Sequence, residues 1–143
     1  MSIRHVGIVV DNLEKMVEFY NLLGFKELNR NNLSGELIDK LIFAYNFNVD
    51  IVKLVSLKDN SIIELLKYNN VNQPRKNKEL YDKGLSHNAF TVDNIDEMCK
   101  ILELAGARFN SPPLFSEKVK VCFCRDIEGN FIELVEDLRW VIT

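Results

Sequence analysis

Four side chains in the 143-residue sequence have types and positions that could bind a metal ion. The chain contains only two histidines, His5 and His87, and each opens an apolar segment. Two glutamates, Glu64 and Glu133, each stand between an isoleucine and a leucine in an otherwise apolar run. A carboxylate inside a buried strand is costly unless it is paired or coordinates a metal. Two imidazoles and two carboxylates form a mixed nitrogen and oxygen set that suits one divalent cation of Zn, Ni, Co, Mn or Fe.

Each of these residues also has a structural explanation. A single histidine on a strand is more often a hydrogen-bonded structural residue than a ligand. A single glutamate in a strand most often lies on the solvated face. An internal repeat makes metal binding the favoured explanation, because it matches the two histidines to each other and the two glutamates to each other. Pseudo-twofold symmetry between the repeats would bring all four side chains to a common axis.

The repeat aligns residues 5–24 with residues 87–106 at a constant offset of 82. Seven of the twenty positions are identical without a gap. The identical pairs are His5 and His87, Val10 and Val92, Asp11 and Asp93, Asn12 and Asn94, Met16 and Met98, Leu22 and Leu104, and Gly24 and Gly106. The ends of the halves also match, with residues 63–65 aligned to residues 132–134 at an offset of 69.

Each repeated segment predicts a strand followed by an amphipathic helix. In both segments the apolar residues recur with the i, i+3, i+4, i+7 spacing of one helix face. The expected helix N-caps are Asp11 or Asn12 in the first half and Asp93 or Asn94 in the second. Gly24 and Gly106 follow the helices and are expected to stop them in the left-handed conformation.

Alternating or β-branched runs predict the remaining strands near residues 25–30, 50–57, 61–68, 118–125 and 130–136. Hairpin turns are expected at residues 59–60 and 128–130. Because the offset falls from 82 to 69, the first half is 13 residues longer, and the spacing of its apolar residues predicts a short extra helix within 36–48.

These elements predict an α+β fold made of two tandem β-α-β-β-β modules. We expect one domain, residues 1–143, that contains a module at 1–68, a polar and turn-rich linker at 69–84 and a module at 85–143. The two curved mixed sheets would enclose a metal-binding cleft. Strand alternation places each histidine on the same face as a small residue two positions later, Gly7 or Ala89, which leaves room for a ligand.

The composition excludes several other classes of protein. With 47% hydrophobic and 27% charged residues the chain has a globular composition, and a net charge of -3 argues against a nucleic-acid partner. No apolar run approaches the ~20 residues of a membrane span, and no signal peptide is evident, so we expect a cytoplasmic protein without a membrane partner. Three cysteines are expected to be reduced thiols. Two of them, Cys122 and Cys124, could form a metal pair, but small apolar residues on one strand face are the favoured interpretation.

The four candidate ligands and their surroundings resemble the vicinal-oxygen-chelate superfamily, which includes glyoxalase, bleomycin-resistance proteins and extradiol dioxygenases. The resemblance covers nearly the whole chain. Its markers are His5 opening HVGIVVDNLEKMVEFYNLLGF, Glu64 in IIELLKY, His87 in GLSHNAFTVDNID and Glu133 in CRDIEGNFIELVE. In glyoxalase I these four positions are the metal ligands, so the resemblance implies that His5, Glu64, His87 and Glu133 bind one divalent cation.

The resemblance also implies a lyase or isomerase that acts on a small molecule with vicinal oxygens. Proton transfer through a metal-bound enediolate needs a base, and no third histidine is present. We therefore expect Glu133 to remove the carbon-bound proton and Glu133 or Glu64 to return it to the neighbouring carbon. In glyoxalase I this reaction converts the hemithioacetal of methylglyoxal and glutathione into lactoylglutathione, which makes lactoylglutathione lyase the leading expectation.

Two other functions remain open. The first is a methylmalonyl-CoA epimerase-like enzyme, although such epimerases tend to carry glutamine at the position of Glu64. The second is a non-catalytic, resistance-type protein that binds a small molecule. The basic residues that could hold an anionic substrate tail, or could simply be solvated, are Arg30, Arg108, Lys120 and Arg125. The resemblance further implies a homodimer, and the apolar tail of Leu138, Trp140, Val141 and Ile142 is expected to cover its own sheet.

Overall fold

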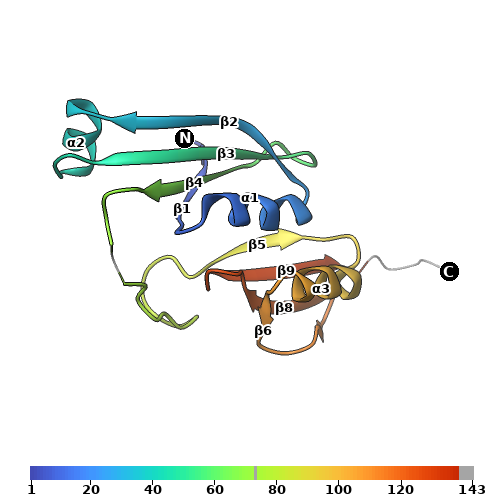
Figure 1. Ribbon diagram of the computed structural model, residues 1–143. Helices are drawn as coiled ribbons and strands as arrows, with labels where there is room; N and C mark the ends of the chain where they lie inside the picture. The colour runs from blue at the N-terminus through green and yellow to red at the C-terminus, as the bar shows by residue number, and fades with distance from the viewer. Residues whose placement is uncertain (73, 139–143) are drawn as a thin grey trace. The chain divides into compact units, whose positions relative to one another are not determined.

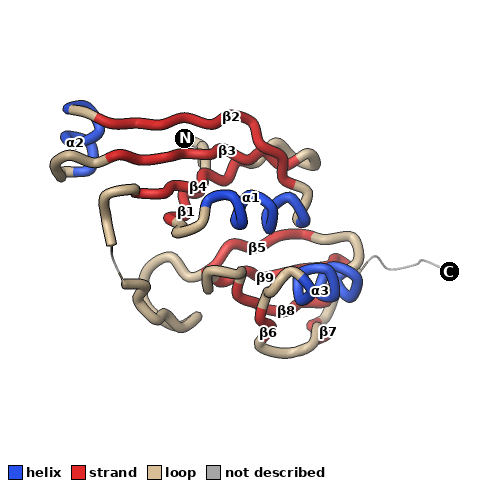
Figure 2. The backbone as a smooth tube through the Cα atoms, in the orientation of Figure 1, coloured by secondary structure: helices blue, strands red, loops and turns tan. Residues whose placement is uncertain are grey.

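Each half of the sequence repeat forms its own mixed β-sheet and its own helix (Figures 1 and 2). The computed structural model describes residues 1–72 and 74–138. Contacts divide the chain into two compact units, Met1–Arg75 and Lys76–Thr143, called here unit 1 and unit 2. The predicted α+β class with mixed sheets is confirmed, whereas the cleft expected between the sheets stays a prediction.

Unit 1 contains a four-stranded sheet in the order β1-β4-β3-β2. Its elements are β1 (Val6–Val9), α1 (Leu13–Leu22), β2 (Phe25–Ser34), α2 (Glu36–Ile42), β3 (Asn48–Ser56) and β4 (Ile62–Tyr68). β1 pairs with β4 in parallel, and the other pairs are antiparallel. The predicted β-α-β-β-β order is therefore present, with α2 inserted between the second and third strands.

Unit 2 repeats this topology in the order β5-β9-β8-β6, and β7 also pairs with β8. Its elements are β5 (His87–Thr91), α3 (Ile95–Leu104), β6 (Arg108–Phe109), β7 (Leu114–Ser116), β8 (Val119–Arg125) and β9 (Phe131–Asp137). β5 is parallel to β9, as β1 is to β4. The first and last strands of each unit are consequently neighbours, which is the pairing that places each histidine beside a glutamate.

The helices pack their apolar stripes on one face of the sheets. In unit 1 the alternation predicted for the first strand is observed, because Ile8 and Val10 are buried while Val9 is 59% exposed. Helix α1 buries Leu13 and Met16 from its apolar stripe. The side chains that make up the core of unit 1 thus come from the helix and from one face of its sheet.

Both helix starts and both helix stops are those expected from the repeat. Asn12 is the N-cap of α1 and its side chain accepts a hydrogen bond from the Lys15 N–H at 3.1 Å. Asn94 caps α3 in the same way through the Glu97 N–H, also at 3.1 Å. Gly24 and Gly106 have φ values of +86° and +102°. These are left-handed conformations that favour glycine, so the helices end there.

The strand that follows the first helix of each unit differs in length and continuity between the units, and both versions differ from the prediction. β2 extends to Ser34, beyond the expected end at residue 30, because it stays paired with β3 as far as Asn48. In unit 2 the corresponding strand is broken into β6 and β7, which the sequence analysis missed. Pro112 and Pro113 lie between these two pieces, and proline cannot donate a hydrogen bond to a sheet.

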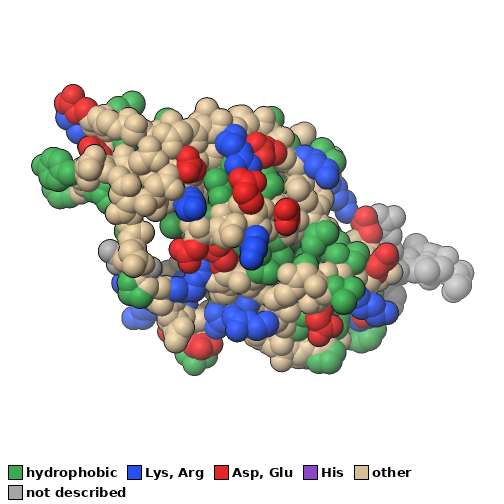
Figure 3. Space-filling view, in the orientation of Figure 1, with side chains coloured by type: hydrophobic (Ala, Val, Ile, Leu, Met, Phe, Trp, Pro, Cys, Tyr) green, Lys and Arg blue, Asp and Glu red, His purple; other side chains and the backbone are tan. Residues whose placement is uncertain are grey.

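The extra helix of unit 1 lies on the surface. α2 ends at Ile42, which is earlier than the expected limit of residue 48, and it buries none of its residues. Leu37, Leu41 and Phe43 are all exposed, and Figure 3 shows apolar side chains at the end of unit 1 that carries α2. Its packing therefore contributes little to the core.

The linker and the tail are described only in part. Within the described residues, no helix or strand lies between Tyr68 and His87. At the other end of the chain the Leu138 N–H donates to the Lys118 carbonyl at 2.8 Å, whereas Trp140, Val141 and Ile142 lie outside the described residues.

None of the described helices has the length and apolar character that crossing a membrane requires.

The cysteines belong to the core of unit 2. Cys122 and Cys124 are buried in β8, and the sulfur atoms of Cys99 and Cys122 lie 3.5 Å apart as free thiols. Burial raises the pKa of the Cys122 thiol well above its usual range and raises the pKa of Cys124 to about 12. The neutral thiols are therefore favoured, which supports the interpretation of both residues as small apolar side chains.

We predict that Asn12→Ala and Asn94→Ala each lower the free energy of unfolding by about 1 kcal/mol, because each removes the side-chain acceptor of a helix N-terminus. Asn12→Ser and Asn94→Ser are the matched controls and should retain most of the stability. Urea unfolding followed by circular dichroism measures the difference. Equal midpoints for an alanine variant and its serine control would contradict the capping role.

We also predict that Cys122 and Cys124 resist alkylation in the native protein at pH 8 and react once urea unfolds it. The folded state raises the pKa of both thiols, so their contribution to stability is present below about pH 8.5, the ordinary thiol pKa, and is lost as the pH rises through the folded pKa. Mass spectrometry after timed iodoacetamide labelling gives the reaction rates. Native labelling as fast as that in urea would show that these side chains are accessible.

Candidate functional site

The first histidine and glutamate pair lies in unit 1. His5 directly precedes β1, and Glu64 lies in the apolar centre of β4. The parallel register puts Gly7 opposite Glu64, so alternation places His5 on the face of the sheet to which Glu64 belongs. His5 Nε2 lies 3.8 Å from Glu64 Oε1, and the Glu64 side chain is only 12% exposed.

The second pair repeats this arrangement in unit 2. His87 is the first residue of β5, and the parallel register with β9 puts Ala89 opposite Glu133. His87 Nε2 lies 3.1 Å from Glu133 Oε2, within hydrogen-bond distance. The Glu133 side chain is 23% exposed, so it is more accessible than Glu64. Two equivalent strand pairings therefore make the same contact at equivalent positions of the repeat.

Two further residues orient His87. The Ser86 hydroxyl donates to the Leu80 carbonyl at 2.8 Å, and its oxygen lies 3.1 Å from His87 Nδ1. Because the hydroxyl hydrogen is already used, the oxygen can only accept from Nδ1–H, which leaves Nε2 of a neutral imidazole with its lone pair toward Glu133. Metal-binding histidines commonly have their other nitrogen held in this way. Phe123 packs against the ring edge to face, with centroids 5.1 Å apart.

A lysine that the sequence analysis did not identify joins the pair in unit 1. Lys53 on β3 stands directly opposite Glu64 in the antiparallel register. Its Nζ lies 3.6 Å from Glu64 Oε2, so Glu64 contacts His5 through one oxygen and Lys53 through the other. No sequence pattern indicates this contact, because it depends on the register between β3 and β4.

The donor separation of the unit 2 pair fits a divalent cation, and that of the unit 1 pair is longer. A metal binds nitrogen and oxygen ligands at about 2.0–2.2 Å, so two adjacent donors on one ion lie about 3.0–3.4 Å apart. The observed separations are 3.1 Å in unit 2 and 3.8 Å in unit 1. The first value lies within that range, and the second exceeds it. Unit 2 therefore offers one imidazole nitrogen and one carboxylate oxygen at a suitable spacing, and unit 1 offers the same two donors farther apart.

The structure places His5 beside Glu64 and His87 beside Glu133, so each unit contains two of the four predicted ligands. Within residues 1–72 and 74–138, no group of three or more His, Cys, Asp or Glu side chains is arranged to hold a metal ion. The complete set of His5, Glu64, His87 and Glu133 therefore stays a prediction.

Three of the basic residues considered as anion ligands are engaged in structural contacts. Arg30 binds Glu14 and also donates from Nη2 to Glu27 at 3.0 Å. Lys120 binds Asp96. Arg125 donates to the Gly129 and Lys78 carbonyls and lies over the Phe131 ring at 3.8 Å. The fourth residue, Arg108, is exposed.

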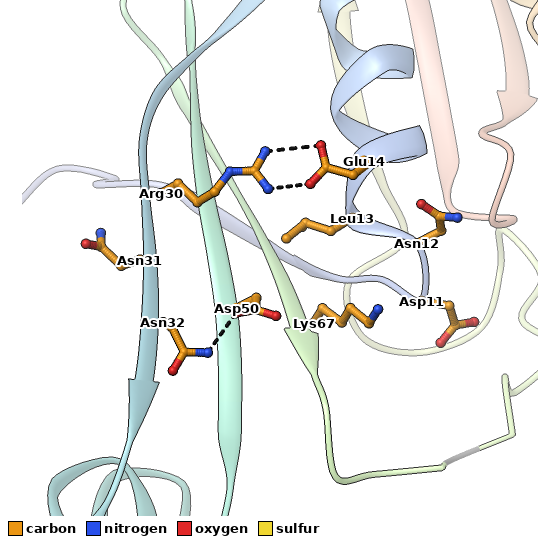
Figure 4. A pocket seen from close by; sticks show the side chains of 9 residues that line it. All are labelled: Asp11, Asn12, Leu13, Glu14, Arg30, Asn31, Asn32, Asp50 and Lys67. Atoms are coloured by element: carbon orange, nitrogen blue, oxygen red, sulfur yellow. Dashed lines mark hydrogen bonds and ion pairs between the residues drawn. The ribbon is translucent and has the colours of Figure 1, made fainter.

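A hollow of about 450 Å³ lies in unit 1 at the N-terminal end of α1 (Figure 4). It is lined by Asp11, Asn12, Leu13, Glu14, Arg30, Asn31, Asn32, Asp50 and Lys67. Lys67 is three residues from Glu64 along β4, so alternation places the two side chains on opposite faces of the sheet. The hollow is therefore separate from the His5 and Glu64 pair, and the Arg30 to Glu14 contact spans part of it.

Comparisons with known proteins agree with the fold. The sequence profile of the Glyoxalase/Bleomycin resistance protein/Dioxygenase superfamily matches residues 2–134. A search of curated protein sequences finds no match to the chain.

Several solved structures are similar over nearly the full length. A glyoxalase family protein from Bacillus cereus is 26% identical with a TM-score of 0.90, and the match covers 97% of this chain and 95% of that one. A glyoxalase family protein from Enterococcus faecalis is 25% identical with a TM-score of 0.67, covering 94% and 97%. The trypanothione-dependent glyoxalase I of Leishmania major, at 20% identity and a TM-score of 0.68 over 95% and 86%, shares the fold. Because the profile match spans almost the whole sequence, this chain belongs to the Glyoxalase/Bleomycin resistance protein/Dioxygenase superfamily.

Proposed function

We propose that the protein is a metal-dependent lyase or isomerase that moves a carbon-bound proton in a small molecule with two vicinal oxygens. The observation that supports this function is the pair of equivalent contacts, His5 with Glu64 and His87 with Glu133, at 3.8 Å and 3.1 Å. In this proposal the two pairs complete one site for a single divalent cation, either within one chain or between two chains of a homodimer.

The two pairs would share the work of holding the cation and moving the proton. When bound, the cation supplies a Lewis acid for the vicinal oxygens of the substrate. His5 and His87 would hold it through ring nitrogens, and the Ser86 oxygen beside Nδ1 would favour the tautomer of His87 whose Nε2 is free to bind. Glu64 and Glu133 donate carboxylate oxygens, and their apolar neighbours on β4 and β9 keep the strands that carry them in place.

Glu133 is the better placed of the two carboxylates to act as the base. Its side chain is 23% exposed, whereas that of Glu64 is 12% exposed and contacts both His5 and Lys53. A carboxylate with fewer contacts can turn toward the substrate more easily. Glu133 would accept the proton from one carbon, and it or Glu64 would return that proton to the neighbouring carbon.

We predict about one divalent metal ion per chain in protein purified without chelator or tag. His5→Ala and His87→Ala should each weaken metal binding by about a hundredfold or more, because loss of an outer-shell partner already costs on the order of tenfold to a hundredfold. Elemental analysis and calorimetric titration with Zn, Ni and Co give these values, with the exposed Glu18→Gln as the control. Absence of metal binding in the parent protein would refute the proposed function and support a non-catalytic binding protein.

The same variants can locate the site. If one site combines unit 1 of one chain with unit 2 of a partner, mixing His5→Ala with His87→Ala subunits regenerates one intact site in each mixed dimer. If each site lies within one chain, mixing restores no metal binding. Both outcomes are compatible with the proposed chemistry and differ only in which chain supplies each pair.

We predict that Glu133→Gln lowers proton exchange by about a hundredfold while the variant still binds metal, because an amide oxygen can remain a ligand but cannot accept the proton. NMR in heavy water, with the hemithioacetal of methylglyoxal and glutathione or with methylmalonyl-CoA, would follow loss of the carbon-bound proton. Exchange with only one of these compounds would separate the glyoxalase reaction from the epimerase reaction. Full turnover by the metal-loaded variant would contradict the role of Glu133.

A further inference from the structure

The two halves of the candidate site differ at one position of their shared register. Lys53 stands opposite Glu64 between β3 and β4, and Phe123 stands opposite Glu133 between β8 and β9. The histidine, the glutamate and the small residue of the two halves correspond to each other. Unit 1 therefore carries a positive charge at a position where unit 2 carries an uncharged phenylalanine.

The charge of Lys53 belongs to the face of the sheet that carries the candidate ligands. Residues directly opposite each other in an antiparallel pair project to the same face. The distance of 3.6 Å between Lys53 Nζ and Glu64 Oε2 shows that the ammonium group reaches the candidate ligand itself. Any molecule that contacts Glu64 from that face will also be close to Lys53.

We infer that Lys53 is a specificity-determining residue, which binds a negatively charged oxygen of the substrate beside the vicinal oxygens. This inference rests on the proposed function and adds a substrate class to it. The class is that of anionic chelating molecules in which one of the two vicinal oxygens belongs to a carboxylate and the other to an adjacent carbon that bears hydrogen, such as 2-hydroxy carboxylates. In these molecules the proton would leave carbon 2 and return to the opposite side of the same carbon, which inverts its configuration. Neutral hydroxyketones would bind less well.

The charge balance of the proposed site supports this class. Two carboxylates, Glu64 and Glu133, match the charge of a divalent cation, so the ammonium of Lys53 leaves the site with one positive charge in excess. A substrate with a single negative charge would neutralise it. Phe123 in the other half adds no charge of either sign, so nothing at that equivalent position offsets the lysine.

The contact geometry also allows Lys53 to change partners. A separation of 3.6 Å is longer than a good hydrogen bond, and the Lys53 side chain is 28% exposed. Lysine carries its charge on a flexible four-carbon stem. A cation bound to Glu64 would repel the ammonium group, which can then leave the carboxylate and meet an anionic oxygen of the substrate on the same face.

The test compares two ligands of nearly equal shape, glycolate and glycolamide, which differ in the negative charge. Their affinities for the metal-loaded protein would be measured by calorimetry or by NMR titration. We expect the preference for glycolate over glycolamide to fall about fivefold to tenfold in Lys53→Met and to change less than about twofold in Lys53→Arg, which keeps the charge. Metal affinity should rise about threefold or more in Lys53→Met, because a neighbouring positive charge has been removed.

Lys67→Met is the matched control. Lys67 is also a lysine on the central strands of unit 1 with an acidic residue opposite it, Asp50, but alternation puts it on the other face of the sheet from Glu64. Figure 4 shows Asp50 and Lys67 near the start of α1. This variant should keep the ligand preference and the metal affinity of the parent protein.

An unchanged preference in Lys53→Met, or an equal fall in Lys67→Met, would overturn the inference while metal binding by the parent protein still supported the proposed function. Failure of the parent protein to bind any metal would overturn both. A circular dichroism spectrum and a thermal midpoint for each variant would confirm that only folded proteins are compared.

Discussion

The candidate site depends on one constraint, which is that a carboxylate lies inside an apolar strand. Glu64 is flanked in β4 by Ile63 and Leu65, both buried, and it is itself almost fully covered. A charged group in such a place is stable only when other groups satisfy it. His5 and Lys53 provide those contacts from the two strands on either side of β4, so the sheet order β1-β4-β3 is also the order of the groups around the carboxylate.

Both units contain a glutamate inside an apolar strand beside a histidine, but the other residues near each pair differ. In both units the first and last strands pair in parallel, and this pairing is what joins residues far apart in sequence. The helix side of the sheets also differs in its charges. In unit 2 the Glu136 carboxylate accepts from the Ile95 N–H at 2.8 Å, whereas the equivalent position in unit 1 carries Lys67. Duplication has therefore kept the histidine and glutamate pairs while the charges around them were free to change.

The two faces of the unit 1 sheet have separate roles because side chains alternate along each strand. One face carries His5, Glu64 and Lys53, and the other carries helix α1 together with the hollow of Figure 4. Arg30 contributes to that second face and is held by Glu14 and Glu27. Its charge therefore stabilises the packing of the helix on the sheet and is not available to a ligand on the first face.

The sequence by itself determined the repeat, the helix caps at Asn12 and Asn94, the stops at Gly24 and Gly106, and the correspondence of the two histidines and two glutamates. These features are local or depend on periodicity, so residue types and spacing are enough to predict them. Only the tertiary structure decided that Lys53 meets Glu64 and that Phe123 packs on His87. These contacts depend on strand register, because a shift of one residue would turn each of these side chains to the other face of its sheet.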